Sequence, residues 1–308
     1  MFGHTLPRAY ARRRVLVAVM AVMVPMAGLA AASPAFAKEP TGDFAVFKQC
    51  PRFTSEVRFC LYSQVTGGKV TINKQTVPIE NTITLQGGIK RNPETEVETF
   101  VGALNGETLS KTPQNVPGGL LGLINCTEIK GSGFLEVLAR EACKAVFENE
   151  FTGVRAITEL ARPASEIGIN KRNLIEQEGA ALSLPVKVRL ENPLLGSECY
   201  VGSSASPLDL NLTTGTTKPE KPNTPIMGES GEIREKDGGT FVEIPDNILV
   251  NNEFSAPEAS GCGGIFAFLL DPLINSKIGL PAADGLNTAI QDTNIFEATG
   301  EAVIKSEK

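Results

Sequence analysis

The sequence predicts a mainly β protein: an antiparallel β-sandwich or open barrel with one packed amphipathic helix and disulfide bridges. In residues 182–191, and again in 208–213, apolar side chains occupy every second position. A period of two is the pattern of a strand with one dry face and one wet face. Between residues 57 and 88, short apolar runs are separated by Gly, Asn and Pro, which is typical of an antiparallel meander.

The first 37 residues have the pattern of a secretory signal peptide. Basic residues precede an apolar segment, 15–32, and a small-x-small cleavage site, AFA, ends at Ala37. A transmembrane anchor is the alternative, since the apolar segment approaches the ~20 residues that a span needs. Pro25 and the cleavage site favour cleavage. We therefore expect a secreted, extracellular protein with no transmembrane span and a single β-rich domain, residues 38–308.

The charge of the remaining chain excludes one class of partner. Residues 38–308 contain 25 basic and 35 acidic residues, a formal charge of −10. A protein of this charge repels phosphates, so we expect no nucleic-acid partner.

Six cysteines, an even number behind a secretion signal, indicate three disulfides. Their wide spacing and the absence of a C-x-x-C motif make a metal site the weaker alternative. Six cysteines allow fifteen connectivities, and we predict pairing of neighbours in the sequence because short loops close easily. The predicted bridges join Cys50 with Cys60, Cys126 with Cys143, and Cys199 with Cys262.

In the first half of the chain, apolar runs bounded by turn residues predict a series of short strands. Glycines 67 and 68 are interpreted as a turn between two of them. The predicted strands cover residues 44–47, 57–63, 69–72, 76–79 and 83–85.

Three glutamates, Glu94, Glu96 and Glu98, share one face of a further predicted strand with Phe100. Such a row of carboxylates is a calcium-site hypothesis in an extracellular protein. A solvated or charge-guarded edge strand is the interpretation we favour.

One segment has helical periodicity. Apolar residues of 134–146 recur at helical spacing, with charged residues opposite, which predicts a helix packed on the sheet and linked to it through Cys143. Residues 154–160 then predict a strand.

The second half of the chain contains the central strand unit, 182–213, and then a different composition. Residues 214–239 are rich in Thr, Pro, Lys, Glu and Gly, which predicts a long exposed loop. Further strands are predicted at 240–244 and, closing the fold, at 296–304.

Three segments carry a resemblance to a known group. Residues 191–203 (ENPLLGSECYVGS), 212–217 (LTTGTT) and 278–283 (IGLPAA) resemble segments of secreted actinobacterial proteins of unknown function, and residues 50–88 are similar as well. The resemblance implies the extracellular compartment and one folded unit. It implies no activity, cofactor or site residue.

The residue inventory excludes several enzyme classes. The only histidine, His4, lies in the predicted signal peptide, and the sequence has no tryptophan. Histidine-dependent triads and histidine-ligated zinc are therefore excluded from the mature chain. The sequence also lacks the G-x-S-x-G motif, the S-x-x-K motif, the Walker loop and the dinucleotide fingerprint. We predict no catalytic residue, no cofactor and no metal ligand.

These observations favour a non-catalytic extracellular or cell-envelope protein that binds a partner or an apolar ligand. The apolar, glycine-rich segments 117–124 and 263–270 are expected to line a cleft, unless they are ordinary core. A carboxylate-dependent extracellular hydrolase is one alternative, because paired carboxylates are the enzymatic route that remains. A structural protein associated with the cell wall is the other.

Overall fold

The computed structural model describes residues 38–54, 56–91, 98–124, 126–148 and 152–308. Residues Lys38–Lys308 form one compact unit, which begins directly after the predicted cleavage site. The predicted signal peptide lies outside the described residues. Two antiparallel sheets of seven strands each make up the unit, and each sheet has free ends rather than closing on itself. The predicted antiparallel β fold is confirmed, as an open sandwich and not as a barrel.

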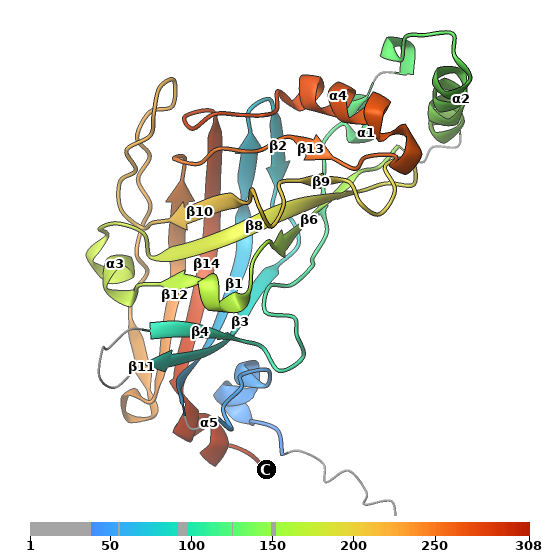
Figure 1. The fold of residues 1–308 in the computed structure, drawn as a ribbon. Coiled ribbons are helices and arrows are strands. Elements are labelled where there is room, and N and C mark those ends of the chain that lie inside the picture. Colours follow the sequence, from blue (N-terminus) through green and yellow to red (C-terminus); the bar gives the residue numbers. More distant parts are fainter. Residues whose placement is uncertain (1–37, 55, 92–97, 125, 149–151) are drawn as a thin grey trace, which may run out of the picture. The chain divides into compact units, whose positions relative to one another are not determined.

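The first sheet contains the long strands of the molecule. Its order is β11-β12-β14-β1-β3-β4, and β2 pairs with β1 at the side. Figure 1 shows β12, β14, β1 and β3 side by side. The strands are β1 (Val57–Ile72), β2 (Gln75–Pro78), β3 (Ile83–Arg91), β4 (Glu98–Gly102), β11 (Arg234–Lys236), β12 (Phe241–Asn251) and β14 (Asn287–Thr299).

The second sheet is built around β8, which pairs with β6, β7, β9 and β10. In β10 the burial follows the predicted alternation, since Leu208, Leu210 and Leu212 are buried while Asp209 and Asn211 are exposed. The predicted central unit is thereby confirmed. The strands are β5 (Gln114–Asn115), β6 (Arg155–Leu160), β7 (Gly168–Ile169), β8 (Leu182–Glu191), β9 (Tyr200–Val201), β10 (Leu208–Leu212) and β13 (Ala259–Ser260).

Helices connect the strands and cover parts of the sandwich. No described helix combines the length and the apolar composition needed to cross a bilayer. The α-helices are α1 (Gly119–Leu123), α2 (Phe134–Glu148), α3 (Lys171–Glu176), α4 (Ala267–Ile278) and α5 (Gly300–Lys305). The 3-10 helices are η1 (Gly42–Phe47), η2 (Cys126–Glu128), η3 (Ala164–Glu166), η4 (Asp237–Gly239) and η5 (Gly264–Phe266).

The predicted turn at glycines 67 and 68 is wrong, because β1 runs through both residues. The register with β14 shifts between Val65 and Gly67, so the strand contains a bulge. Gly68 has a φ of +104°, and a Cβ there would lie 2.1 Å from the carbonyl oxygen of Ile290. These glycines therefore permit a bulge and a close approach of the neighbouring strand. A Gly-Gly pair occurs in turns as well as in bulges, so the sequence pattern alone does not separate the two.

Both ends of the described chain also differ from the predictions. Residues 44–47 belong to η1 rather than to a strand, and they bury Phe47. The predicted closing strand at 296–304 ends at Thr299, whose side-chain oxygen accepts a hydrogen bond from the backbone N–H of Ala302. This N-cap begins α5 and ends the strand.

The predicted helix is confirmed as α2, and Ala139 and Cys143 belong to the main hydrophobic core, but most of its apolar side chains are exposed. Phe134 is 80% exposed, and Leu135 and Leu138 are also exposed. Ala139 and Cys143 are the buried residues of its described face. Figure 1 shows α2 apart from both sheets. The helix is thus linked to η2 through the Cys126–Cys143 bridge, and Phe134, Leu135 and Leu138 face solvent.

The predicted long loop, 214–239, is exposed over much of its length but is anchored to the sandwich. Thr214 and Thr217 are buried, and the Thr214 hydroxyl donates a hydrogen bond of 2.7 Å to the carbonyl oxygen of Leu174. The segment also contains β11, which extends the first sheet. The polar composition of the segment correctly predicted that most of it is exposed. The sequence does not show which threonines are buried and hydrogen-bonded to the backbone.

The three predicted disulfides, Cys50–Cys60, Cys126–Cys143 and Cys199–Cys262, are present, and no free cysteine occurs in the described chain. The bridges differ in the length of chain that they close. Cys199 and Cys262 are 63 residues apart, whereas Cys50 and Cys60 are separated by 10 residues.

Removal of the long-range bridge should destabilise the protein more than removal of the short one. From loop closure entropy we expect a loss of about 4 kcal/mol for C199A/C262A and about 3 kcal/mol for C50A/C60A. Urea unfolding of the two double variants measures both values. Equal losses would show that the length of the closed loop does not determine the contribution of these bridges.

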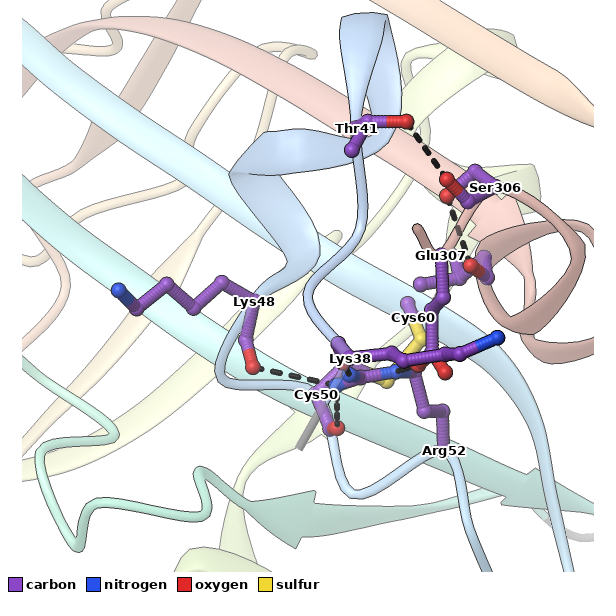
Figure 2. A network of polar contacts seen from close by, with 9 residues as sticks. Lys38, Thr41, Lys48, Cys50, Arg52, Cys60, Ser306 and Glu307 are labelled. Carbon is purple, nitrogen blue, oxygen red and sulfur yellow. Dashed lines mark hydrogen bonds and ion pairs between the residues drawn. A yellow bond between two sulfur atoms is a disulfide. The ribbon is translucent and has the colours of Figure 1, made fainter. Parts of the chain in front are cut away.

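A buried ion pair holds the two ends of the unit together (Figure 2). Arg52 Nε lies 2.5 Å from Glu307 Oε1, and both side chains are less than one-tenth exposed. The guanidinium also donates hydrogen bonds to the carbonyl oxygens of Lys38, Lys48 and Cys50. The segment that follows the predicted cleavage site is thereby attached to the C-terminal residues.

Replacement of Glu307 by Gln should leave the Arg52 charge buried without its counter-ion. We expect a loss of about 3 kcal/mol in the free energy of unfolding, measured by urea titration. The matched control is E301Q, which removes an exposed partner of Lys305 on α5 and should change stability little. Similar effects of the two variants would contradict a special role for the buried pair.

Candidate functional site

The two sheets enclose a cavity of about 120 Å³, which we call the inner cavity. Twenty of its 28 lining residues are Val, Leu or Ile. Most of them come from inward positions of strands, where side chains alternate toward the opposite sheet. A single water needs roughly 10–15 Å³ by such a measure, so the cavity is far larger than a hydration site. Its chemistry is that of an apolar binding site.

Both sheets contribute to the inner cavity. β1 and β3 supply residues such as Val65 and Leu85 from the first sheet, and β8 and β10 supply residues such as Val186 and Leu210 from the second. The polar side chains in the lining are few. They are Ser63, Gln75, Gln114, Thr158, Gln291 and Thr293.

The segments expected to line a cleft contribute little to this cavity. Among the residues of 117–124 whose side chains are described, Leu123 alone lines it, and no residue of 263–270 does. Leu120 and Leu270 are buried core residues, while Ile265 and Phe268 are exposed. The cavity is instead lined mostly by strand residues. Apolar and polar residues alternate along such strands whether the interior is filled or contains a cavity. No signal in the sequence distinguished the two cases.

A second cavity of about 260 Å³, the outer cavity, lies against the inner one. Ser63, Leu85, Leu182 and Leu249 line both cavities. Most of the outer lining is aliphatic and includes Ile175 and Ile233, which are also partly exposed to solvent. Unlike the inner cavity, the outer one contains charged residues. They are Lys171, Glu235 and Glu297.

Lys171 is positioned at the start of α3. The side-chain oxygen of Asn170 accepts a hydrogen bond from the backbone N–H of Asn173, which caps the helix. The ammonium of Lys171 lies 2.8 Å from Glu297 and 3.9 Å from Glu98. It also lies 4.0 Å from the ring centroid of Phe59, a cation–π distance. The edge of the outer cavity is thus a compact charge cluster on three elements far apart in the sequence.

Glu297 is the buried acid of this cluster, with its side chain 16% exposed. Burial raises the pKa of its carboxyl above the usual value, against the opposing effect of the Lys171 ammonium, and the Glu98 carboxylate adds to the rise. The sequence did not predict this group, because Glu297 and Lys171 are 126 residues apart and each lies in an ordinary amphipathic pattern.

The predicted carboxylate row can be followed only in part, because Glu94 and Glu96 lie outside the described residues. Glu98 begins β4 and contacts Lys171. Across the described ranges, no group of three or more potential metal-ligating side chains occurs. Glu98 therefore belongs to an ion-pair cluster in this structure.

A second set of charges lies on strands of the second sheet. Arg189 contacts Glu159 at 3.0 Å and Glu191 at 2.6 Å, and the Lys187 ammonium lies over the Tyr200 ring. Burial, followed by the Glu159 carboxylate, raises the pKa of the Tyr200 hydroxyl. These contacts join β6, β8 and β9, so their role is to pair strands.

Comparison with known proteins finds no matching family model, no matching curated protein and no matching solved structure. The resemblance to secreted actinobacterial proteins is not tested by these results. The function must therefore be argued from the cavities and the charge cluster themselves.

The pKa of Glu297 has a measurable consequence for stability. Its folded-state pKa is raised, so its contribution is fully present below the ordinary glutamate pKa of about 4.3 and is lost as the pH rises through the folded value. We expect the stability of the wild type, relative to E297Q, to fall as the pH rises through this range. Urea unfolding of both proteins at a series of pH values measures the difference.

The variant K171M provides the second arm of this experiment. Loss of the ammonium removes the interaction that lowers the Glu297 pKa, so the decline in stability should extend to higher pH than in the wild type. A stability difference between wild type and E297Q that is independent of pH would contradict the raised pKa.

Proposed function

We propose that this protein is a secreted, non-catalytic binding protein that holds an apolar ligand between its two sheets. The observation that carries the proposal is the inner cavity, with its aliphatic lining from both sheets. Cavities of similar size lined by Leu, Ile and Phe stay dry and bind small apolar molecules such as benzene. The adjoining outer cavity supplies further apolar volume and partly exposed residues at its edge.

The energetic cost of the cavity supports this function. At about 24 cal/mol for each Å³, an unfilled space of this volume lowers stability by about 3 kcal/mol. Larger side chains at positions such as Ala156 would fill part of the space. A cavity kept open at this cost is expected where a ligand fills it and restores the lost contacts.

Export is the second part of the proposal. Three disulfides are typical of an oxidising compartment. The compact unit begins at Lys38, and Arg52 donates a hydrogen bond to the carbonyl oxygen of that residue. Cleavage after Ala37 would thus leave the ordered contacts of the fold intact. The protein would then act outside the cell or at its envelope.

The charge cluster is the observation relevant to the hydrolase alternative. Glu297, with its raised pKa, and Glu98 both lie within 4 Å of the same ammonium. A carboxylate pair of this kind resembles the acid and base of a glycosidase. However, Lys171 contacts both carboxylates, so a glycosidic bond would have to displace it. The cluster fits a structural ion pair at a cavity edge better than a catalytic pair.

The proposal is tested by native mass spectrometry of protein secreted by its own host, before and after organic extraction. We expect an additional mass that extraction removes. In A156L the introduced side chain projects into the inner cavity, so the additional mass should be reduced by about tenfold or lost. The matched control is A142L on α2, a residue that lines neither cavity, which should retain the wild-type mass.

A bare mass in the wild type would contradict a stably bound ligand and direct attention to a wall-associated role. Equal retention of the ligand by A156L and A142L would show that the ligand binds elsewhere. Circular dichroism of both variants verifies that each is folded.

A further inference from the structure

The inner cavity contains polar groups that the fold itself does not use. Ser63 is 6% exposed and Gln291 is 8% exposed, and both side chains line the cavity. Among the described residues, no group forms a hydrogen bond with the Ser63 hydroxyl or with the Gln291 side-chain amide. Both polar groups open onto the cavity, since the fully buried side-chain atoms without a partner in the described chain are Asn252 Oδ1 and Asp284 Oδ1. A polar group that faces an apolar cavity gains a hydrogen bond when a ligand oxygen enters.

Gln114, another polar residue of the same cavity, has hydrogen-bond partners within the fold. The side-chain oxygen of Gln114 accepts hydrogen bonds from the backbone N–H groups of Glu80 and Asn81, and its nitrogen donates to the Asn81 carbonyl. Gln114 therefore has a structural role that accounts for its burial. Ser63 and Gln291 have no such role.

The two unpartnered groups lie where the cavities meet. Ser63 lines both the inner and the outer cavity. Gln291 on β14 is the register partner of Leu249 on β12, which also lines both. Ser63 pairs with Ile295, four residues further along β14, so polar groups occur at two levels of one apolar channel. At about 3.3 Å for each residue, these levels are roughly 13 Å apart along the strand.

From this arrangement we infer that the ligand is an elongated apolar molecule with uncharged oxygen functions at two separated positions, such as a long-chain diol, hydroxy ketone or hydroxy ester, which hydrogen-bonds with Ser63 and Gln291. The inference rests on the proposed function and specifies its ligand class. A hydroxyl or carbonyl oxygen satisfies the buried serine and amide groups, whereas a plain hydrocarbon leaves them unsatisfied. The polar pair thus discriminates oxygenated chains from hydrocarbons of equal length.

The test uses delipidated protein and the displacement of a fluorescent apolar reporter by decane and by decane-1,10-diol, whose two hydroxyls can reach both levels. S63A and Q291M should each weaken binding of the diol by about three- to tenfold while leaving decane binding unchanged or stronger. The matched control is S183A. Ser183 lines neither cavity, and its hydroxyl donates a hydrogen bond of 2.7 Å to Asn211, so both affinities should stay at the wild-type value.

Thermal unfolding of the ligand-free variants gives an independent measurement. Since the Ser63 hydroxyl has no partner in the described fold, S63A should unfold at the same temperature as the wild type or at a higher one. A clear decrease for S63A would overturn the inference, because the hydroxyl would then have a structural partner.

The outcomes separate this inference from the proposed function. If neither decane nor decane-1,10-diol displaces the reporter, the proposed binding function fails. If both displace it but S63A and Q291M weaken them equally, apolar binding stands and the assignment of an oxygenated ligand is overturned.

Discussion

The pairing of β1 with β14 is the interaction on which the rest of the structure depends. It joins residues 57–72 to residues 287–299, close to the two ends of the folded unit. Each strand is also paired on its other edge, β1 with β3 and β14 with β12, so the pair forms the centre of the first sheet. The bulge between Val65 and Gly67 is accommodated within this pairing.

The same pair determines which side chains enter the interior. Inward positions of β14 place Gln291 and Thr293 in the inner cavity, and Ile295 and Glu297 in the outer one. The interior of a sandwich is usually apolar at such positions. Here one strand carries polar groups along both cavities and ends at the charge cluster. The site is therefore a property of the central strand and not of a surface loop.

The sequence predicted the features that depend on local patterns. The alternation of Leu208 and Leu210 determined a strand, and the helical period at 134–146 determined α2. Pairing of neighbouring cysteines was predicted because local loops close with the least loss of entropy. For the strand, the helix and the two short bridges, the signal and the structure lie within the same short stretch of chain, whereas Cys199 and Cys262 are 63 residues apart.

Features that depend on contacts between distant segments could not be predicted from local sequence patterns. The contact of Lys171 with Glu297 joins residues 126 positions apart, and either residue alone is an ordinary surface charge. The exposure of Phe134 means that no element of the described chain covers this side chain, which no local periodicity records. Likewise, Ser63 appears in the sequence as one polar position in a strand. Its burial and lack of a partner exist only once β14 and the second sheet are in place.

The charge at the edge of the outer cavity also favours an uncharged ligand. Among the described residues that line the outer cavity, Lys171 is the one basic residue. Its ammonium already pairs with Glu297, while Glu235 adds a further carboxylate. The chain from residue 38 onward has a formal charge of −10, whose field repels anions over distances of about a Debye length. A free carboxylate or phosphate head would meet this repulsion at the point of entry. An uncharged chain with two separated oxygen functions avoids this repulsion and still hydrogen-bonds with the Ser63 hydroxyl and the Gln291 amide. The electrostatics of the edge and the polar groups of the interior therefore select the same class of molecule.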